Sequence, residues 1–214
     1  QEFECSFTAA VSGAYYGRLI TKAEKEKRIT KVPYDESVGV ETWWDLGIGD
    51  STSIWFAQRI GEEIHLIDYY ETSGESLAHY ANVLEEKDYA YSSHIAPHDI
   101  TARELGTGKS RLEVANELGI DFDVAPKLEV HHGIESVRNA LPNCWFDREK
   151  CKVGLDALRQ YRKQWDEKNQ VFKNKPHHNW CSHAADSFRY GCVSEPIDTS
   201  DWDRPITVDT KYVI

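Results

Sequence analysis

The sequence predicts an α/β domain built on one mixed five-stranded sheet, with an antiparallel meander of strands 1–3, then parallel strands, and helices on both faces. Two observations carry this prediction. Between residues 38 and 71, β-branched and aromatic residues alternate with polar ones and are interrupted by glycine turns at hairpin spacing. Beyond residue 73, stretches with helical spacing of apolar residues alternate with short apolar runs, which is typical of crossover connections between parallel strands.

The first strand of the meander ends at an acidic residue. Its strands are expected at residues 40–46, 51–60 and 63–71. Asp45 closes the first apolar run, Gly47 and Gly49 allow a tight reversal, and Gly61 supplies the second turn. Asp45 therefore lies at a strand exit, where its carboxylate can face a metal ion; the alternative is that it merely starts a turn.

The rest of the chain alternates between helices and strands. Helices are expected at residues 8–27, 73–89, 110–118, 133–141, 151–165 and 180–193, and strands at 92–97 and 122–126. The strand at 92–97 should lie parallel to the first strand, because a crossover helix returns the chain in the same direction. Residues 166–178 are expected to form a basic loop. On the last helix, a stripe of small and apolar residues should let the helix lie close to the sheet: Cys181, Ala184, Ala185, Phe188 and Cys192.

The 214 residues, 40% of them hydrophobic, are expected to form one folded domain. We assign residues 1–37 to a linker or connection, 38–193 to the folded domain and 194–214 to a C-terminal tail. The lack of Met and the initial Gln are typical of a fragment. No apolar run approaches the roughly 20 residues of a membrane span, so no membrane partner is expected. Five widely spread cysteines without a C-x-x-C pair indicate free thiols: Cys5, Cys144, Cys151, Cys181 and Cys192.

Charge is distributed unevenly along the chain. The formal net charge of −11 argues against a simple electrostatic nucleic-acid binder. Residues 18–31, however, hold six basic and two acidic residues, and residues 148–175 hold nine basic and four acidic residues. Either segment can follow a phosphate backbone, the alternative being a solvated helix face with i,i+4 ion pairs. In the second segment, Arg159, Arg162 and Lys163 are the candidate DNA contacts.

Three acids from separate elements form the candidate site. Asp45 follows the first strand, Asp99 follows the fourth, and Asp186 lies on the last helix. Adjacent strand exits covered by a helix can bring three carboxylates together, and such like charges are tolerated when divalent cations lie among them. The arrangement predicts a two-metal phosphodiester hydrolase in which hard oxygen ligands favour two Mg²⁺ or Mn²⁺ ions over zinc. His183 and Glu71 are candidates for supporting these ligands, or else ordinary surface residues.

Longer motifs carry a resemblance to a known family: QEFECSF, GAYYG, WWDLGIGDSTSIWF, IDYYE, HDITARELGTGKSRLEVANELGI and HAADSFRYG, spread over residues 1–191. The chain resembles the C-terminal nuclease domain of the large terminase subunit of tailed bacteriophages, which has a ribonuclease H-like fold. The resemblance implies a metal-dependent endonuclease that cuts concatemeric double-stranded DNA at the start and end of packaging. It places the family's acidic metal ligands on Asp45, Asp99 and Asp186.

The resemblance also implies partners and a setting. The expected partners are double-stranded DNA, an N-terminal ATPase domain of the same subunit, the portal protein and the small terminase subunit. Residues 1–37 would then be the connection to that ATPase domain. The expected location is the host cytoplasm, within the packaging motor and outside the mature virion.

Several alternatives stay open. The chain can be a non-catalytic module that grips DNA or docks the motor to the portal, or another ribonuclease H-like nuclease such as a junction resolvase. Residues 106–110 (GTGKS) suggest a phosphate loop, but Arg103 stands where that motif needs glycine, so we interpret the segment as a DNA contact through Lys109, a mobile flap or a plain turn. The soft-ligand cluster of His177, His178, Cys181 and His183 matches no usual zinc spacing.

Overall fold

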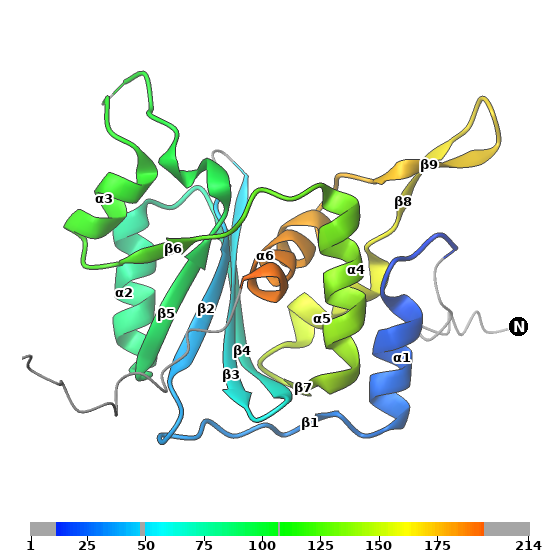
Figure 1. Ribbon diagram of the computed structural model, residues 1–214, viewed down its shortest axis with the longest axis horizontal. Helices are drawn as coiled ribbons and strands as arrows, with labels where there is room; N and C mark the ends of the chain where they lie inside the picture. Colours follow the sequence, from blue (N-terminus) through cyan, green and yellow to red (C-terminus); the bar gives the residue numbers. More distant parts are fainter. Residues whose placement is uncertain (1–11, 48–49, 107, 195–214) are drawn as a thin grey trace, which may run out of the picture.

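A seven-stranded mixed sheet forms the centre of the protein, in the order β1-β7-β4-β3-β2-β5-β6 (Figure 1). The computed structural model describes residues 12–47, 50–106 and 108–194. The strands of the sheet are β1 (Ile29–Thr30), β2 (Val40–Asp45), β3 (Ser51–Ile60), β4 (Glu63–Ser73), β5 (Tyr91–Ala96), β6 (Phe122–Val124) and β7 (Cys144–Asp147). The meander β2-β3-β4 is antiparallel, and β5, β6, β7 and β1 join in parallel, as the sequence predicts.

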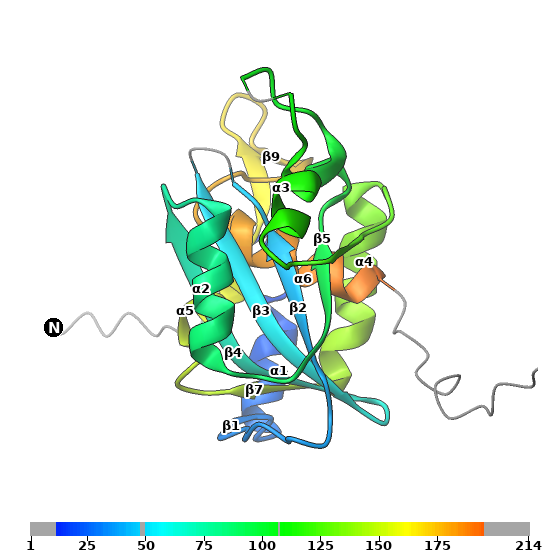
Figure 2. The same ribbon diagram turned by 90° about the vertical axis from the view of Figure 1, so that its left-hand side faces the viewer.

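Helices cover both faces of this sheet. They are α1 (Gly17–Lys25), α2 (Leu77–Lys87), α3 (Arg111–Glu117), α4 (Val130–Ala140), α5 (Lys152–Gln160) and α6 (Cys181–Val193), with short 3₁₀ turns η1 (His98–Thr101) and η2 (Leu141–Asn143). Figure 2 looks onto the face that α2 and α3 cover. On the other face α6 lies directly against β2 and β3, flanked by α4 and α5, with α1 outside α5. None of the described helices is long and apolar enough to cross a membrane.

The predicted count of five strands is too low by two. The missed strands, β1 and β7, form the edge beyond β4, and β7 pairs with β4 over only three residues, Ile64 to Leu66. Such short segments show no period-two pattern, so only their pairing makes them strands.

The helix expected at 151–165 ends at Gln160, because Tyr161 adopts an extended conformation (φ −60°, ψ 116°). The chain then forms a separate antiparallel hairpin of β8 (Lys163–Asp166) and β9 (Val171–Pro176), where a basic loop was expected. In Figure 1 this hairpin projects from the body. Tyr161 is buried against α1 rather than on the sheet face, since its carbonyl accepts a hydrogen bond from the Tyr15 N–H at 2.9 Å and its ring stacks on Tyr16.

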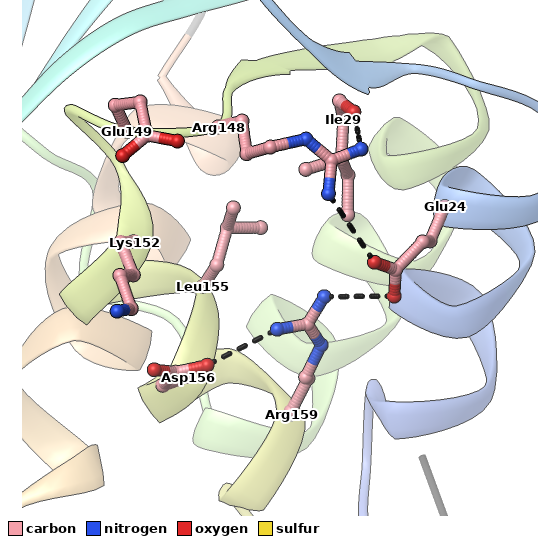
Figure 3. Close-up of a pocket in the computed structure, with 8 residues that line it drawn as sticks. All are labelled: Glu24, Ile29, Arg148, Glu149, Lys152, Leu155, Asp156 and Arg159. Atoms are coloured by element: carbon pink, nitrogen blue, oxygen red, sulfur yellow. Dashed lines mark hydrogen bonds and ion pairs between the residues drawn. The ribbon is translucent and has the colours of Figure 1, made fainter. Parts of the chain in front are cut away.

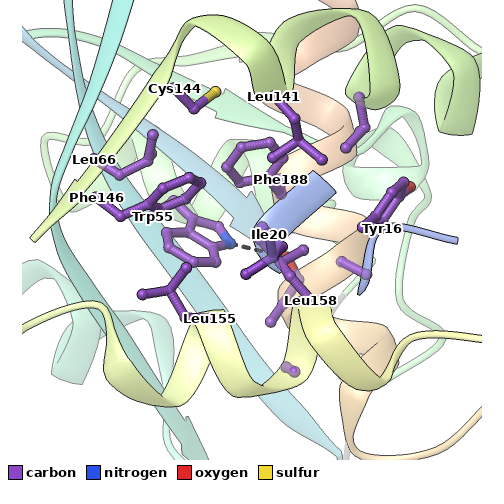
Figure 4. Close-up of a cluster of buried hydrophobic side chains, with 14 of the residues drawn as sticks. Tyr16, Ile20, Trp55, Leu66, Leu141, Cys144, Phe146, Leu155, Leu158 and Phe188 are labelled. Carbon is purple, nitrogen blue, oxygen red and sulfur yellow. Dashed lines mark hydrogen bonds between the residues drawn. The ribbon is translucent and has the colours of Figure 1, made fainter. Parts of the chain in front are cut away.

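Aromatic side chains fill the core between α6 and the sheet. Trp55, Phe146 and Phe188 are fully buried and meet in one cluster, part of which Figure 4 shows. The indole N–H of Trp55 donates to the carbonyl of Ala184 on α6 at 2.9 Å. The predicted apolar stripe on this helix is confirmed, with its first four members buried and Cys192 half-buried. The four cysteines in the described ranges are free; Cys5 lies outside them.

Residues 28–32 are fastened to the β7 edge by side chains as well as by strand pairing. The buried Arg28 donates to the carbonyls of Leu141 at 3.0 Å and Cys144 at 2.6 Å. Asp147 accepts from the N–H of Val32 at 3.0 Å. Since α1 packs in the same core, part of the segment assigned to a connection (1–37) lies in the folded body. The domain division itself stays a prediction, and most of the predicted tail (residues 195–214) lies outside the described residues, as does the segment 1–11.

Gly191 allows the closest approach of α6 to the sheet. A Cβ atom there would lie 1.8 Å from the Trp43 ring. We predict that Gly191→Ala lowers the free energy of unfolding by about 3 kcal/mol, because the helix and Trp43 must move apart. Urea unfolding measures the change. Gly106→Ala, where a Cβ meets no atom within 4 Å, is the matched control and should change stability by less than about 0.5 kcal/mol. Equal stability of the two variants would contradict the prediction.

Candidate active site

The site starts from a row of polar residues across the three meander strands. Asp45 on β2 lies opposite Ser53 on β3, and Ser53 lies opposite Glu71 on β4. Directly opposed residues of antiparallel strands share one face of a sheet. That face carries α6, because the Ser53 and Ser187 hydroxyls hydrogen-bond at 2.8 Å. The carboxylates of Asp45 and Glu71 therefore belong to the same helix-covered surface.

His183 on α6 bridges two carboxylates. Its Nδ1 lies 3.2 Å from Oδ2 of Asp45, and its Nε2 lies 3.1 Å from Oδ1 of Asp50. The imidazole is 8% exposed, while Asp50 is 55% exposed and stands just beyond the turn after β2. The hydrogen bond to Asp45 raises the pKa of His183, which favours the imidazolium form that donates from both nitrogens. His183 thus lies beside Asp45, and its role as a support for a metal ligand stays a prediction.

Asp45 is a half-buried acid whose pKa lies above its usual value. Burial raises its pKa, the hydrogen bond from His183 lowers it, and the negative charge of Asp186 raises it again. The side chain is 19% exposed. Asp45 and Asp186 are therefore close enough to repel each other in a poorly hydrated setting.

Asp186 lies one helical turn after His183 and is held by Arg189. Nη2 of Arg189 lies 3.0 Å from Oδ1 of Asp186, and Nε lies 3.3 Å from the same atom. The guanidinium is 9% exposed and stacks over the Tyr190 ring at 4.6 Å. The negative charge of Asp186 contributes to the raised pKa of Arg189. Asp186 therefore has a fixed cation beside it.

Asp99 occupies the rim of the site. It lies in η1 directly after β5, the parallel neighbour of β2, so the predicted adjacency of the two strand exits is confirmed. Its side chain is 61% exposed and lies 3.7 Å from Nη2 of Arg111. Nη1 of the same arginine donates to the carbonyl of Leu46 at 2.8 Å. Arg111 therefore ties the Asp99 turn to the end of β2.

The donor chemistry suits a hard divalent cation. Carboxylate oxygens are the ligands that Mg²⁺ prefers, and a cation would offset the repulsion from Asp186 that adds to burial in raising the pKa of Asp45. Within the described ranges, however, no group of three or more His, Cys, Asp or Glu side chains is gathered closely enough to hold a metal ion. The structure brings Asp45 and Asp186 together and leaves Asp99 on the rim.

Comparison with known proteins identifies the architecture. Neither a protein-family model nor a curated protein sequence matches the chain. Among solved structures, a large terminase from a thermophilic bacteriophage aligns with a TM-score of 0.61 and 18% identity over 77% of this chain and 41% of that one. The nuclease domain of the P22 large terminase aligns with a TM-score of 0.60 and 16% identity, covering 78% of this chain and 88% of that one.

A third relative was solved with a metal. The large terminase nuclease of the thermophilic phage G20c with bound magnesium aligns with a TM-score of 0.56 and 12% identity, covering 85% of this chain and 97% of that one. This chain has the large terminase nuclease fold. The predicted ribonuclease H-like architecture is thereby confirmed, with seven strands in place of five. The chain spans less than half of the first of these three relatives.

Two predicted DNA contacts of this terminase nuclease fold already have acidic partners. Arg159 pairs with Glu24 at 3.0 Å and with Asp156 at 3.1 Å, beside a cavity of about 260 Å³ (Figure 3). Lys109 donates to Glu117 at 2.5 Å. Arg162 and Lys163, by contrast, form the base of the β8–β9 hairpin. No observation tests the DNA-contact assignments, and all four stay predictions.

Several residues of the site were not predicted from the sequence. They are Asp50, Ser53 and Ser187, which no motif or spacing singled out. Arg189 could have been found, since Asp186 and Arg189 stand at i,i+3 on one helix. Glu71, a candidate support, accepts a hydrogen bond from the Tyr69 hydroxyl at 2.5 Å.

The bridge at His183 predicts a stability difference between two histidines. His183→Ala removes the donor from the half-buried Asp45 and should lower the free energy of unfolding at pH 7 by about 2 kcal/mol in metal-free buffer. His178→Ala is the matched control, because His178 is 75% exposed and 3.8 Å from Asp50. That variant should stay within about 0.5 kcal/mol of the parent in urea unfolding. Losses of equal size in both variants would show that the bridge does not stabilise Asp45.

Proposed function

We propose that this chain is a metal-dependent endonuclease that hydrolyses phosphodiester bonds of concatemeric double-stranded viral DNA during genome packaging. The observation that carries the proposal is the placement of two carboxylates in a large terminase nuclease fold: Asp45 ends a central strand and contacts His183 of α6, and Asp186 lies one turn further along that helix. Paired acids in a partly dehydrated pocket are typical of metal-assisted phosphoryl chemistry.

Asp45, Asp99 and Asp186 are the proposed ligands of two Mg²⁺ or Mn²⁺ ions. When bound, such ions supply activation of the attacking water and stabilisation of the departing oxygen. The magnesium-bound G20c nuclease supports the choice of a divalent ion. The number of ions and the ligand assignment rest on the chemistry and the placement of the three acids.

The neighbouring residues prepare these acids for their role. His183 holds the Asp45 carboxylate in place from Nδ1, while Asp50 fixes the imidazole orientation from Nε2. Arg189 fixes the rotamer of Asp186. Because Arg111 contacts both Asp99 and the end of β2, it can keep the exposed third acid near the other two. Preorganisation of this kind reduces the rearrangement needed when substrate binds.

The larger setting is part of the proposal. We propose that an ATPase domain of the same subunit precedes this domain, and that the portal protein and the small terminase subunit complete the packaging motor in the host cytoplasm. The large terminase of which this chain spans less than half supports the first point, since it was also solved in complex with ADP and with ATP-γ-S.

A non-catalytic module that grips DNA or docks on the portal is the second candidate. It is favoured by one observation, that no three-ligand group is gathered among the described residues. Plasmid incubated with the protein and Mn²⁺, with and without chelator, separates the two functions. Branched DNA beside plain duplex tests the further alternative of a junction resolvase.

The proposal predicts the effect of charge removal at each acid. Asp45→Asn, Asp99→Asn and Asp186→Asn should each lower the rate of plasmid cleavage with Mn²⁺ by at least about 100-fold, because each removes an anionic ligand from the site. Asp186→Asn should also reduce stability, since Arg189 is then buried beside an uncharged partner. Rates are therefore compared at equal folded fractions, measured by circular dichroism.

The matched control is Asp123→Asn, which removes one exposed carboxylate on β6. It should cut at the parental rate. Near-parental cleavage by any two of the three site variants would refute the ligand assignment, and chelator-insensitive cleavage would refute the metal requirement.

A further inference from the structure

The exposed tryptophan and phenylalanine side chains in the described part of the chain all lie in one short segment. Three are exposed: Trp165 by 42%, Phe172 by 37% and Trp180 by 48%. Trp165 and Phe172 face each other across the β8–β9 hairpin, and Trp180 immediately precedes α6. Three large aromatic residues in sixteen positions leave a concentrated apolar surface that the fold itself does not cover.

The hairpin is a defined platform. The rings of Trp165 and Phe172 meet edge to face with centroids 4.7 Å apart. The Phe172 ring packs so closely on Gly13 that a Cβ there would lie 2.6 Å from it. At the base, the Lys163 N–H donates to the Gly13 carbonyl at 3.0 Å, and the His177 N–H donates to the Arg162 carbonyl at 2.9 Å. The aromatic pair is therefore held in place before any ligand arrives.

Positive charge surrounds this aromatic surface. Arg162 and Lys175 are exposed, Lys163 is half-buried, and none of the three makes an ion pair with an acid in the described part of the chain. One hollow of about 440 Å³ is lined by Arg162, Lys163, Trp165 and Phe172, with Glu167 as its one acidic residue. A second hollow of about 170 Å³, between the hairpin and α4, is lined by Lys163, Lys175 and Arg138. In a chain of net charge −11, this local cationic surface complements a polyanion.

The same surface continues into the candidate active site. Strand β9 leads through His177 and Trp180 directly into α6, and the Ser182 hydroxyl reaches the His177 carbonyl at 3.5 Å. His183, which bridges Asp45 and Asp50, lies six positions after His177. A DNA strand bound to the hairpin would thus pass from the aromatic surface along the start of α6 to Asp45 and Asp186.

We propose that the β8–β9 hairpin and the start of α6 bind DNA with unpaired bases next to the acids, with Trp165 and Trp180 stacking on bases and Arg162 and Lys175 contacting phosphates. The inference rests on the proposed nuclease function and deepens it by naming the preferred DNA as locally melted or single-stranded. The flat face of a base becomes available to an aromatic side chain only where pairing and stacking are lost, whereas cations bind the backbone of any DNA.

The test measures binding without cleavage. Fluorescence anisotropy in EDTA at low salt compares a labelled single strand, a blunt duplex and a duplex with an internal unpaired bubble. The parental protein should bind the single strand and the bubble at least about fivefold more tightly than the blunt duplex. Trp165→Ala with Trp180→Ala should weaken binding to these two DNAs about tenfold and leave duplex binding unchanged. Trp165→Phe alone should retain the preference, because an aromatic face remains.

Two further variants separate charge from stacking. Arg162→Ala with Lys175→Ala should weaken binding to all three DNAs alike. The salt dependence of the affinity should then report the release of about one to two fewer counterions. Lys127→Ala removes one exposed cation between β6 and α4, outside both basic segments of the sequence, and should leave binding unchanged. Thermal unfolding confirms that each variant is folded.

Equal parental affinity for blunt duplex and bubble, or unchanged binding by the double tryptophan variant, would overturn the inference. So would an absence of DNA binding by the parent, which would leave the aromatic surface to a protein partner. If the preference for unpaired DNA is present while Mn²⁺-dependent cleavage is absent, the nuclease proposal fails and the binding surface stands.

Discussion

The packing of α6 onto the centre of the sheet is the contact on which the candidate site depends. Gly191 lets the helix approach Trp43, and the Trp55 indole anchors the same helix through the Ala184 carbonyl. Ser187 then reaches Ser53 across the interface at 2.8 Å. Because these contacts fix both the height and the rotation of the helix, His183 and Asp186 are presented to the end of β2. A larger residue at 191 would disturb the acids without touching them.

The electrostatics of the site follow from that burial. Asp45 loses hydration beneath the helix, and its pKa rises accordingly. Two cationic partners, His183 for Asp45 and Arg189 for Asp186, come from the same helix that causes the dehydration. Each acid of the pair thus has one cationic partner, and the Asp186 charge still adds to the raised pKa of Asp45.

Much of the fold was predictable because local pattern and global topology agree there. The meander strands β2 and β3 begin where the alternation of apolar residues begins, and β5 lies parallel to β2 because the crossover helix returns the chain in the same direction. The acids Asp45 and Asp99 could therefore be placed on adjacent strand exits. The period-two signal was absent from β1 and β7, which owe their existence to pairing with a longer partner.

The β8–β9 hairpin and the partners of the acids could not be predicted from the local sequence pattern. Tyr161 and Trp165 continue a helical spacing of apolar residues, yet one is buried against α1 and the other is exposed on β8. Where the helix ends, long-range contacts replace helical ones: Tyr161 pairs with Tyr15 and stacks on Tyr16, and the Lys163 N–H donates to the Gly13 carbonyl. Likewise, Asp50 becomes a partner of His183 through a contact between residues 133 positions apart, which no spacing rule encodes.

The fastening of residues 28–32 to the β7 edge has a mechanical consequence. Tension applied along the chain from the side of α1 reaches Arg28 and the parallel β1–β7 pair before it reaches β2. Parallel edge strands with lateral side-chain anchors are loaded in shear, so several hydrogen bonds resist together rather than opening one at a time. Asp45 lies at the opposite end of β2, with β4 and β3 between it and that edge. Along the chain, tension would therefore meet the β1–β7 pair before it reaches the strand that carries Asp45.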